Sequence, residues 1–268
     1  MRHVALEDLI KDFFDGHEGK KDKKRLLRAR KTLEGKAKGD RKKYIDDNGG
    51  SKWSPIKNRL TDALGNKCWY TEAELVGASL TIDHFRPSSL YWWLAFEVEN
   101  YRVACPYSNS PKFNPEYGIA GGKGDDFPLL PPGTRATSEA EVAAENPIIL
   151  DPCKQEDCEL LTFQADGRPT INPAFAGDKI ANTRVDESKI LLNLDHPDFN
   201  TKREQLCNEI ADDVRDYEYP TTGTHTKNQI LIRMKRRLSV DAPFSMAARQ
   251  YVRFYRHLDW IEPLLTES

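Results

Sequence analysis

The sequence has few cysteines and no long uninterrupted apolar run. Its five cysteines are an odd number spread over 268 residues, which fits a reducing compartment better than a disulfide framework. A membrane-crossing helix needs roughly 20 apolar residues, and no stretch approaches that length. The first eight residues, MRHVALED, include two acids where a signal peptide needs an apolar stretch. These absences predict a cytoplasmic protein that does not enter a membrane.

The chain as a whole also lacks an excess of either charge. It has 40 Lys and Arg against 42 Asp and Glu, so net charge alone indicates no partner. The positive charge is nevertheless concentrated, because residues 20–43 contain 13 Lys or Arg and only three acids. This basic segment is either a solvated helix or an arm that orders on contact with a polyanion.

A nucleotide-binding loop is missing as well, although Gly121-Gly122-Lys123-Gly124 looks like part of one. Such a loop needs glycine where this chain has Tyr117, and serine or threonine where it has Gly124. Any use of ATP must therefore belong to a partner protein.

Apolar periodicity and turn residues predict an α+β protein whose C-terminal half is helical. We expect three regions, namely an N-terminal helix with the basic segment (1–50), a central core with a long loop and a hairpin (51–175), and a helical region (176–268). Within them the pattern predicts these features: a helix over 4–14, a flexible joint at 48–51, a helix ending near Gly65, strands near 80–83 and 101–105, a loop over 113–132, a buried strand over 147–150, a hairpin over 161–171 turning at Asp166-Gly167, and helices from Ile180 onwards.

One window contains the residue types that phosphodiester hydrolysis needs, which are a base, ligands for a hard cation and a rigid frame. Asp83 and Asn109 offer oxygen atoms to Mg²⁺ or Mn²⁺, and the neighbouring His84 can accept a proton near neutral pH. Asn100 can hold the backbone that presents His84. Lys112 follows Asn109 by three residues, so on a continuing helix it can meet a phosphate oxygen. An Asp-His pair alone is usually structural or solvent-exposed, so the argument depends on all five residues together.

The order Asp-His, Asn, Asn, Lys resembles the HNH endonuclease family, whose ββα-metal core consists of two strands followed by a helix. The resemblance implies that Asp83 and Asn109 are metal ligands, that His84 is the general base, and that Asn100 holds the loop between the strands. The stretches Asp83–Pro87 (DHFRP) and Trp92–Ala95 (WWLA) look like the HNH subunit of Septu-type antiphage defence systems, including the retron-associated, PtuB-like relatives.

That resemblance implies an ATPase partner and a nucleic-acid substrate, with DNA favoured. Beside such a core, the basic segment favours nucleic-acid binding. The residues that we expect to contact nucleic acid are Arg86, Lys20, Lys21, Lys23, Lys24 and Arg25. Two alternatives stay open: an RNase, such as a tRNA-cutting effector, and a non-catalytic subunit that binds nucleic acid or supports assembly.

The sequence departs from the family at its zinc knuckle. Many HNH proteins of this type hold a structural zinc ion with two Cys-x-x-Cys pairs, but here the pairs read Cys68…Thr71 and Cys105…Ser108. Hydroxyls are poor substitutes for thiolates as zinc ligands. We therefore expect no structural zinc and a core that keeps the knuckle geometry by packing. Cys153 and Cys158 can complete a site only if the fold brings them near.

Overall fold

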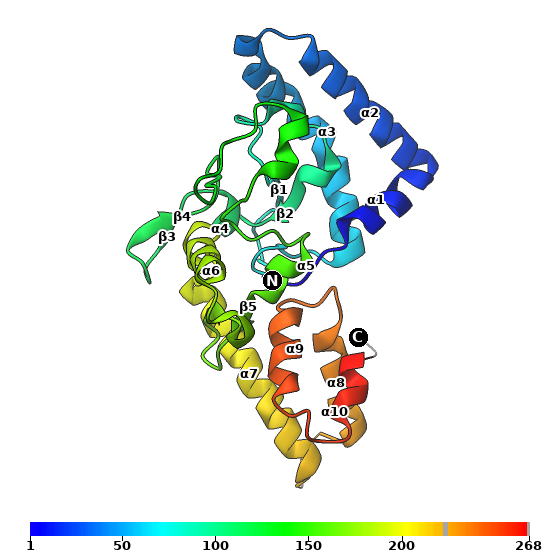
Figure 1. The fold of residues 1–268 in the computed structure, drawn as a ribbon. Helices are drawn as coiled ribbons and strands as arrows, with labels where there is room; N and C mark the ends of the chain where they lie inside the picture. Colours follow the sequence, from blue (N-terminus) through cyan, green and yellow to red (C-terminus); the bar gives the residue numbers. More distant parts are fainter. Residues whose placement is uncertain (222–224, 267–268) are drawn as a thin grey trace.

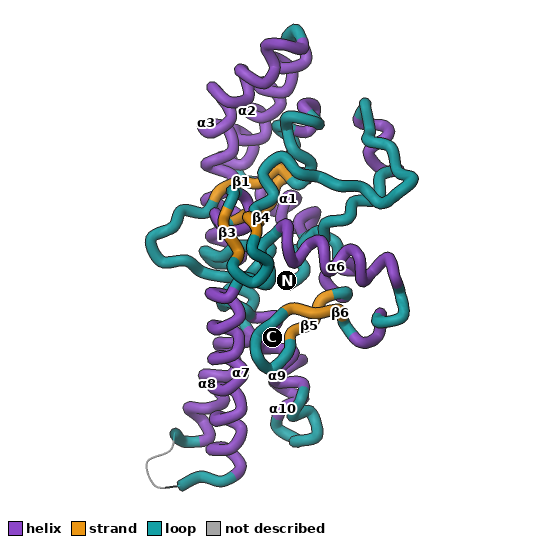
Figure 2. Tube along the Cα trace, turned by 90° about the vertical axis from the view of Figure 1, so that its left-hand side faces the viewer, coloured by secondary structure: helices purple, strands orange, loops and turns teal. Residues whose placement is uncertain are grey.

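The computed structural model describes residues 1–221 and 225–266, and in these ranges it contains ten α-helices and three two-stranded antiparallel sheets (Figures 1 and 2). This is the predicted α+β class with a helical C-terminal half. No helix in the described ranges is long and apolar enough to cross a membrane.

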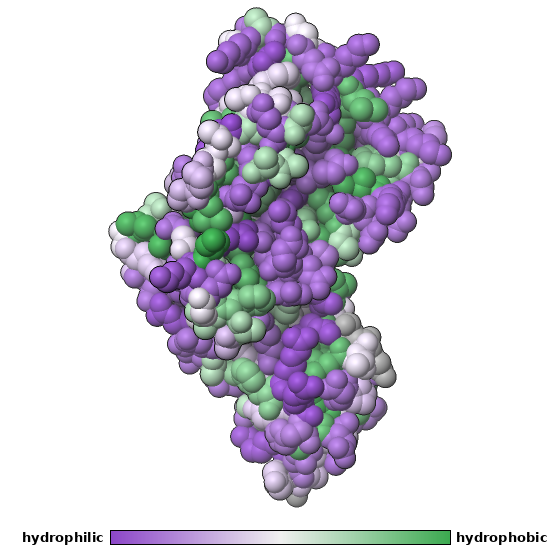
Figure 3. All heavy atoms as spheres, in the orientation of Figure 1, coloured by the Kyte–Doolittle hydropathy of each residue, from purple (hydrophilic) through white to green (hydrophobic). Residues whose placement is uncertain are grey.

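The basic segment is helical. Helix α1 (Leu6–Asp15) leads into α2 (His17–Glu34), which packs beside α3 (Lys38–Leu64) in the upper part of Figure 1. Leu26 and Leu33 of α2 are buried, whereas Leu27 and the lysines of the helix are exposed. The surface of this upper part is accordingly mostly hydrophilic in Figure 3. Of the two alternatives for the segment, the helix is the one observed.

The flexible joint predicted at 48–51 is wrong, because α3 is a continuous helix from Lys38 to Leu64. The boundary expected at residue 50 therefore falls inside a helix. Gly49 serves packing here, since a Cβ atom at this position would lie 1.9 Å from the ring of Trp53, one turn further on. The ring of Trp53 in turn packs edge-on against His84, with ring centroids 4.9 Å apart.

The central sheet joins β1 (Thr81–His84) to β2 (Tyr101–Ala104), with Asp83 opposite Arg102 and His84 opposite Tyr101. Apolar side chains of both strands are buried. Helix α3 packs against this sheet, and the short helix α4 (Pro106–Asn109) follows β2 directly. The order strand, loop, strand, helix is therefore present, although the helix has only four residues.

The loop expected over 113–132 contains structure. Strands β3 (Lys112–Asn114) and β4 (Ile119–Gly121) form a hairpin that projects from one side of the molecule (Figure 1). The strand predicted over 147–150 is wrong, because that stretch makes only an isolated bridge between Leu129 and Pro147. Ile149 and Leu150 are nevertheless buried, and Ile149 belongs to a cluster with Phe85, Tyr91 and Phe127.

The remaining chain follows the predicted pattern. The hairpin of β5 and β6 turns at Asp166-Gly167, where Gly167 has the positive φ of 80° that this turn requires. The elements from residue 155 onwards are α5 (Gln155–Glu159), β5 (Leu161–Phe163), β6 (Pro169–Ile171), α6 (Lys179–Leu191), α7 (Pro197–Glu218), α8 (Lys227–Leu238), α9 (Ser245–Arg253) and α10 (Ile261–Thr266). Single 3₁₀ turns occupy Trp92–Leu94, Val98–Asn100, Glu139–Ala144 and Pro173–Phe175.

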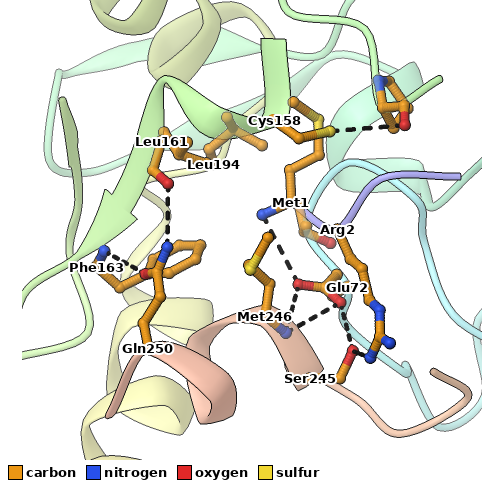
Figure 4. A network of polar contacts seen from close by, with 12 residues as sticks. Met1, Arg2, Glu72, Cys158, Leu161, Phe163, Leu194, Ser245, Met246 and Gln250 are labelled. Carbon is orange, nitrogen blue, oxygen red and sulfur yellow. Dashed lines mark hydrogen bonds and ion pairs between the residues drawn. The ribbon is translucent and has the colours of Figure 1, made fainter. Parts of the chain in front are cut away.

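A buried carboxylate fastens the C-terminal helices to the central part (Figure 4). Glu72 is only 2% exposed and accepts hydrogen bonds from the Ser245 hydroxyl (2.8 Å) and the Met246 amide (3.2 Å) at the start of α9. Burial alone would raise the pKa of Glu72, but the Lys67 ammonium 3.3 Å away, the N-terminal ammonium of Met1 and the Ser245 hydroxyl together hold the pKa below its usual value. The ionised carboxylate thus joins two parts of the chain that are far apart in sequence.

Two adjacent glycines of α3 give a matched test of the packing around Trp53. We expect Gly49→Ala to lower the free energy of unfolding by about 1–2 kcal/mol, because displacing the Trp53 ring outweighs the better helix propensity of alanine. Gly50 has open space around its Cβ position, so Gly50→Ala should raise the free energy of unfolding by about 0.5–1 kcal/mol. Urea unfolding followed by circular dichroism measures both. Equal effects of the two substitutions would contradict the tight Gly49–Trp53 contact.

Candidate active site around Asp83 and His84

A pocket of about 240 Å³ brings three of the predicted site residues together. Asp83 and His84 line it from the end of β1, and Asn109 lines it from the end of α4. The other residues around it are Ile82, Pro87, Ser88, Gly124 and Asp125. Asp125 adds a carboxylate that the sequence analysis did not single out.

The carboxylate of Asp83 is 2% exposed and has two strong partners. Its Oδ2 accepts a hydrogen bond of 2.6 Å from the Tyr70 hydroxyl, and its Oδ1 lies 2.8 Å from the ammonium of Lys123. Lys123 is also buried, and its ammonium donates to the carbonyl of His84 at 2.7 Å. Since a buried charge is costly without a partner, this ion pair is what permits an ionised aspartate at the strand end.

The backbone before Lys123 has a conformation that lets the Lys123 side chain reach Asp83. Gly122 has a φ of +102°, and a Cβ atom there would lie 1.8 Å from the carbonyl oxygen of Ser110. The Lys123 amide donates to the carbonyl of Ser108 at 2.8 Å. The glycines that look like a phosphate-binding loop therefore allow the backbone to pass close to the chain after α4 and to carry a lysine to Asp83.

The ring of His84 is held in one orientation. Its Nε2 lies 2.9 Å from the carbonyl oxygen of Ala95, and the rings of Trp53 and Tyr101 pack edge-on against it. Because a carbonyl only accepts, the neutral ring must carry its hydrogen on Nε2, which leaves the lone pair on Nδ1. Burial lowers the pKa of His84 below its ordinary value, against the opposing influence of the Ala95 hydrogen bond and the Asp83 charge. His84 is therefore a neutral base.

Asn100 lies just before β2 and holds the chain that follows His84. Its Oδ1 accepts from the Arg86 amide at 2.8 Å, and its Nδ2 donates to the Arg86 carbonyl at 2.9 Å. The same Nδ2 lies 3.4 Å from the carbonyl of Leu94, next to the residue that bonds His84. One side chain thus closes both ends of the loop between the strands.

The side-chain amide of Asn109 is oriented so that its oxygen can accept a further bond. Thr81 Oγ1 donates to the carbonyl of Ala104 (3.3 Å), so its hydrogen is used and it must accept the 3.0 Å bond from Asn109 Nδ2. Asn109 Oδ1 is therefore the end of the amide left to accept from another group.

The donor set fits a hydrated hard cation. Asp83 and Asn109 supply a carboxylate and an amide oxygen, and Mg²⁺ commonly binds through one or two carboxylates while keeping several waters. The carboxylate of Asp83 already binds one cation, the ammonium of Lys123. In the described part of the chain, no group of three or more His, Cys, Asp or Glu side chains is arranged to hold a metal, so any ion here depends on waters or a substrate for its other ligands.

Two predicted residues are placed differently from expectation. Lys112 is in strand β3 and not on a helix, because α4 ends at Asn109, and its exposed ammonium lies 5.0 Å from the centre of the Tyr107 ring. Lys123 takes the place beside Asp83. Arg86 makes an internal ion pair with Glu145 at 2.8 Å, so the guanidinium expected to contact nucleic acid is neutralised within the protein.

The predicted basic residues of α2 divide into two groups. Lys21, Lys24 and Arg25 line a groove of about 520 Å³ together with Arg28 and Lys52. Lys20 and Lys23 are exposed outside its lining. The structure therefore gives the basic segment a concave, positively charged face.

The four positions of the incomplete zinc knuckle converge. The sulfur of Cys68 lies 3.7 Å from the Ser108 hydroxyl, which lies 3.7 Å from the sulfur of Cys105, and that sulfur lies 4.0 Å from the Thr71 hydroxyl. Ligand atoms of a tetrahedral zinc site with bonds of about 2.3 Å lie about 3.8 Å apart. The chain keeps the knuckle geometry with two thiols and two hydroxyls.

The two thiols of this cluster influence each other. Burial alone would raise the pKa of Cys68, but hydrogen bonds from Cys105 and Thr71 lower it to about 6. The pKa of Cys105 is raised, by its hydrogen bond to Cys68 and by burial. Cys158 instead faces the carbonyls of Asp151 and Pro152. The absence of structural zinc stays a prediction.

Restoring both thiolates tests this geometry. We expect the double variant Thr71→Cys/Ser108→Cys to bind one Zn²⁺ per chain, because four sulfur atoms would then stand at tetrahedral spacing. Metal analysis by mass spectrometry and the cobalt spectrum of the Co²⁺-substituted protein measure it, with Cys153→Ser in the same background as a control that should change nothing. A double variant without bound metal would show that the cluster is too wide or too rigid for zinc.

The Lys123–Asp83 ion pair gives a second test. We expect Lys123→Met to lower the free energy of unfolding by about 3 kcal/mol, because it leaves a buried carboxylate without its partner. Mn²⁺ should then raise the melting temperature of this variant more than that of the unsubstituted protein. Lys112→Met, at an exposed lysine, should change the free energy of unfolding by no more than about 0.5 kcal/mol. An equal Mn²⁺ response in all three proteins would mean that Asp83 does not bind the ion.

Comparison with known proteins gives one distant similarity. No family model matches the chain. The chain is 27% identical over 126 residues to Septu protein PtuB of Bacillus mycoides (strain KBAB4), and the match covers 42% of this chain. It spans only 39% of that relative's length. The chain is therefore similar to a Septu PtuB protein over part of its length.

Proposed function

We propose that this protein is a metal-dependent HNH endonuclease that hydrolyses phosphodiester bonds of nucleic acid. The observation that carries the proposal is the pocket in which a neutral His84 adjoins the oxygen ligands Asp83 and Asn109. The strand, loop, strand and helix that position these residues have the order of a ββα-metal core. Asn100 supports the same assignment, because it closes the loop between the two strands.

Each residue then has a defined part in the reaction. Nδ1 of His84 removes a proton from the attacking water, while the Ala95 carbonyl keeps the ring in the required tautomer. Asp83 and Asn109 would hold Mg²⁺ or Mn²⁺, which when bound neutralises charge on the phosphate and the leaving oxygen. Tyr70 fixes the carboxylate of Asp83 through its 2.6 Å hydrogen bond. Such fixed geometry is the main contribution that a protein frame makes to the reaction.

The similarity to a Septu PtuB protein supports a role in antiphage defence. In that role the chain is the cytoplasmic effector beside an ATPase subunit, which would supply the nucleotide chemistry that its own sequence lacks. DNA is the favoured substrate. An RNase remains the alternative within the same chemistry, since none of the assigned steps uses a 2′-hydroxyl.

A second candidate function is a non-catalytic binding or assembly subunit. The observation that favours it is the pairing of Asp83 with Lys123, which already satisfies the carboxylate without a metal ion. The neutral, oriented His84 argues against it, because a purely structural histidine has no need of a free Nδ1.

Substitution of the base separates these functions. We expect His84→Ala to abolish cleavage of plasmid DNA or of RNA in the presence of Mg²⁺ or Mn²⁺, with a loss of at least 10²-fold, because general base catalysis contributes about 10²–10⁴-fold. The exposed His257 provides a control, since His257→Ala should cut at the unsubstituted rate. Assays with and without the ATPase subunit are needed. Cleavage retained by His84→Ala would place the base elsewhere, and no cleavage by any form with the partner present would favour the binding subunit.

A further inference from the structure

A second groove adjoins the candidate active site. It has a volume of about 410 Å³ and lies between the start of α3 and the chain after β1. Its lining residues are Lys38, Arg41, Lys42, Ile45, Ser88, Ser89, Leu90, Trp92, Trp93, Arg135, Ala136 and Thr137. Ser88 lines both this groove and the pocket around Asp83 and His84, so the two hollows meet at that residue. We call it the α3 groove.

The α3 groove is positively charged. Four of its lining residues are Lys or Arg and none is Asp or Glu. Lys38 is exposed and has no acidic partner among the described residues, and Lys42 has only an exposed contact of 3.5 Å with Asp46. Arg135 donates to the neutral hydroxyl of Tyr91 and to the carbonyl of Phe127. These charges are therefore available to an anionic ligand.

The groove also contains a flat stacking unit. The guanidinium carbon of Arg41 lies 3.6 Å from the centre of the Trp92 ring, and Trp92 is only partly buried. Proteins that bind single-stranded nucleic acid combine such stacking surfaces with basic side chains that follow the backbone. Bases within a duplex are already stacked on one another, so this pairing of features suits an unpaired strand.

We propose that the α3 groove binds one strand of nucleic acid next to the phosphate that is cut. Lys38, Lys42 and Arg135 contact its phosphates, and a base stacks against Arg41 and Trp92. This inference rests on the proposed nuclease function, to which it adds the path of the substrate. The path is distinct from the groove lined by Lys21 and Lys24, which does not share a residue with the active-site pocket.

The dimensions agree with this path. Lys38 and Trp53 are 15 residues apart on one helix, which corresponds to about 22 Å along its axis. Trp53 packs against His84, so α3 extends from the groove to the candidate base.

The test measures binding without cleavage. It uses the His84→Ala protein and a fluorescein-labelled single strand of mixed sequence, about 20 nucleotides long to exceed the roughly 4–16 that one binding fold covers. The strand is supplied as DNA and as RNA, and anisotropy gives the affinity over a series of salt concentrations. The variant is Lys38→Gln/Lys42→Gln. The control, Lys179→Gln/Lys202→Gln, removes the same charge from exposed lysines of α6 and α7.

Each phosphate contact contributes about 0.7 to the slope of log affinity against log salt for single strands. We expect Lys38→Gln/Lys42→Gln to reduce the slope by about 1.4 and the control to leave it unchanged. An unchanged slope, or an equal change in both variants, would overturn the inference. If instead the variant loses the ATPase subunit in a binding assay while its slope stays the same, the groove is a protein interface and the inference is also wrong.

Cleavage assays distinguish failure of this inference from failure of the proposed function. If the chain with His84 intact cuts nucleic acid and Lys38→Gln/Lys42→Gln cuts and binds equally well, the groove assignment fails and the nuclease stands. If the chain never cuts but the slope falls as expected, the groove binds nucleic acid as proposed, and it is the nuclease proposal that fails.

Discussion

The buried negative charge of Asp83 is the constraint on which the candidate site depends. A carboxylate removed from water is stable only with close partners, and Asp83 receives them from the Tyr70 hydroxyl and the Lys123 ammonium. These two residues come from different parts of the chain, one before β1 and the other after the projecting hairpin. All three segments must therefore meet for the charge of Asp83 to be compensated, so the ion pair ties the geometry of the site to the fold.

The altered zinc knuckle explains how Tyr70 reaches Asp83. Tyr70 lies within the turn between Cys68 and Thr71, and this turn is held against the turn of Cys105 and Ser108 by buried contacts among the four side chains. The Ser108 hydroxyl also donates to the carbonyl of Leu192 at 2.9 Å, just after α6. The C-terminal helices thus support the junction between these two turns. Two hydroxyls suffice here because they are buried and hydrogen-bonded, whereas as zinc ligands they would be weak.

The features that local rules determine could be predicted from the sequence, and those that depend on distant residues could not. Periodicity indicated the end of α3 and the strands of the central sheet, and Asp166-Gly167 marked the β5–β6 turn. Gly49 was misread because turn chemistry was considered without the packing of Trp53 one turn later. Lys112 was chosen by its spacing from Asn109, but the β3–β4 hairpin intervenes and brings Lys123 to the site instead. No local pattern pairs Arg86 with Glu145, which lies 59 residues away.

Helix α3 would connect the proposed substrate groove to His84, the proposed base. Its first turns line the α3 groove, and Trp53, four turns later, packs against His84. Pro55 lacks the amide that would bond the Ser51 carbonyl, so the helix between the groove and Trp53 loses a backbone hydrogen bond only in its last turn. The glycines at 49 and 50, which would weaken an isolated helix, are retained where one of them admits the Trp53 ring. A strand bound in the proposed groove at the start of α3 would be placed relative to His84 by this one helix, and reactions that depend on positioning require such placement.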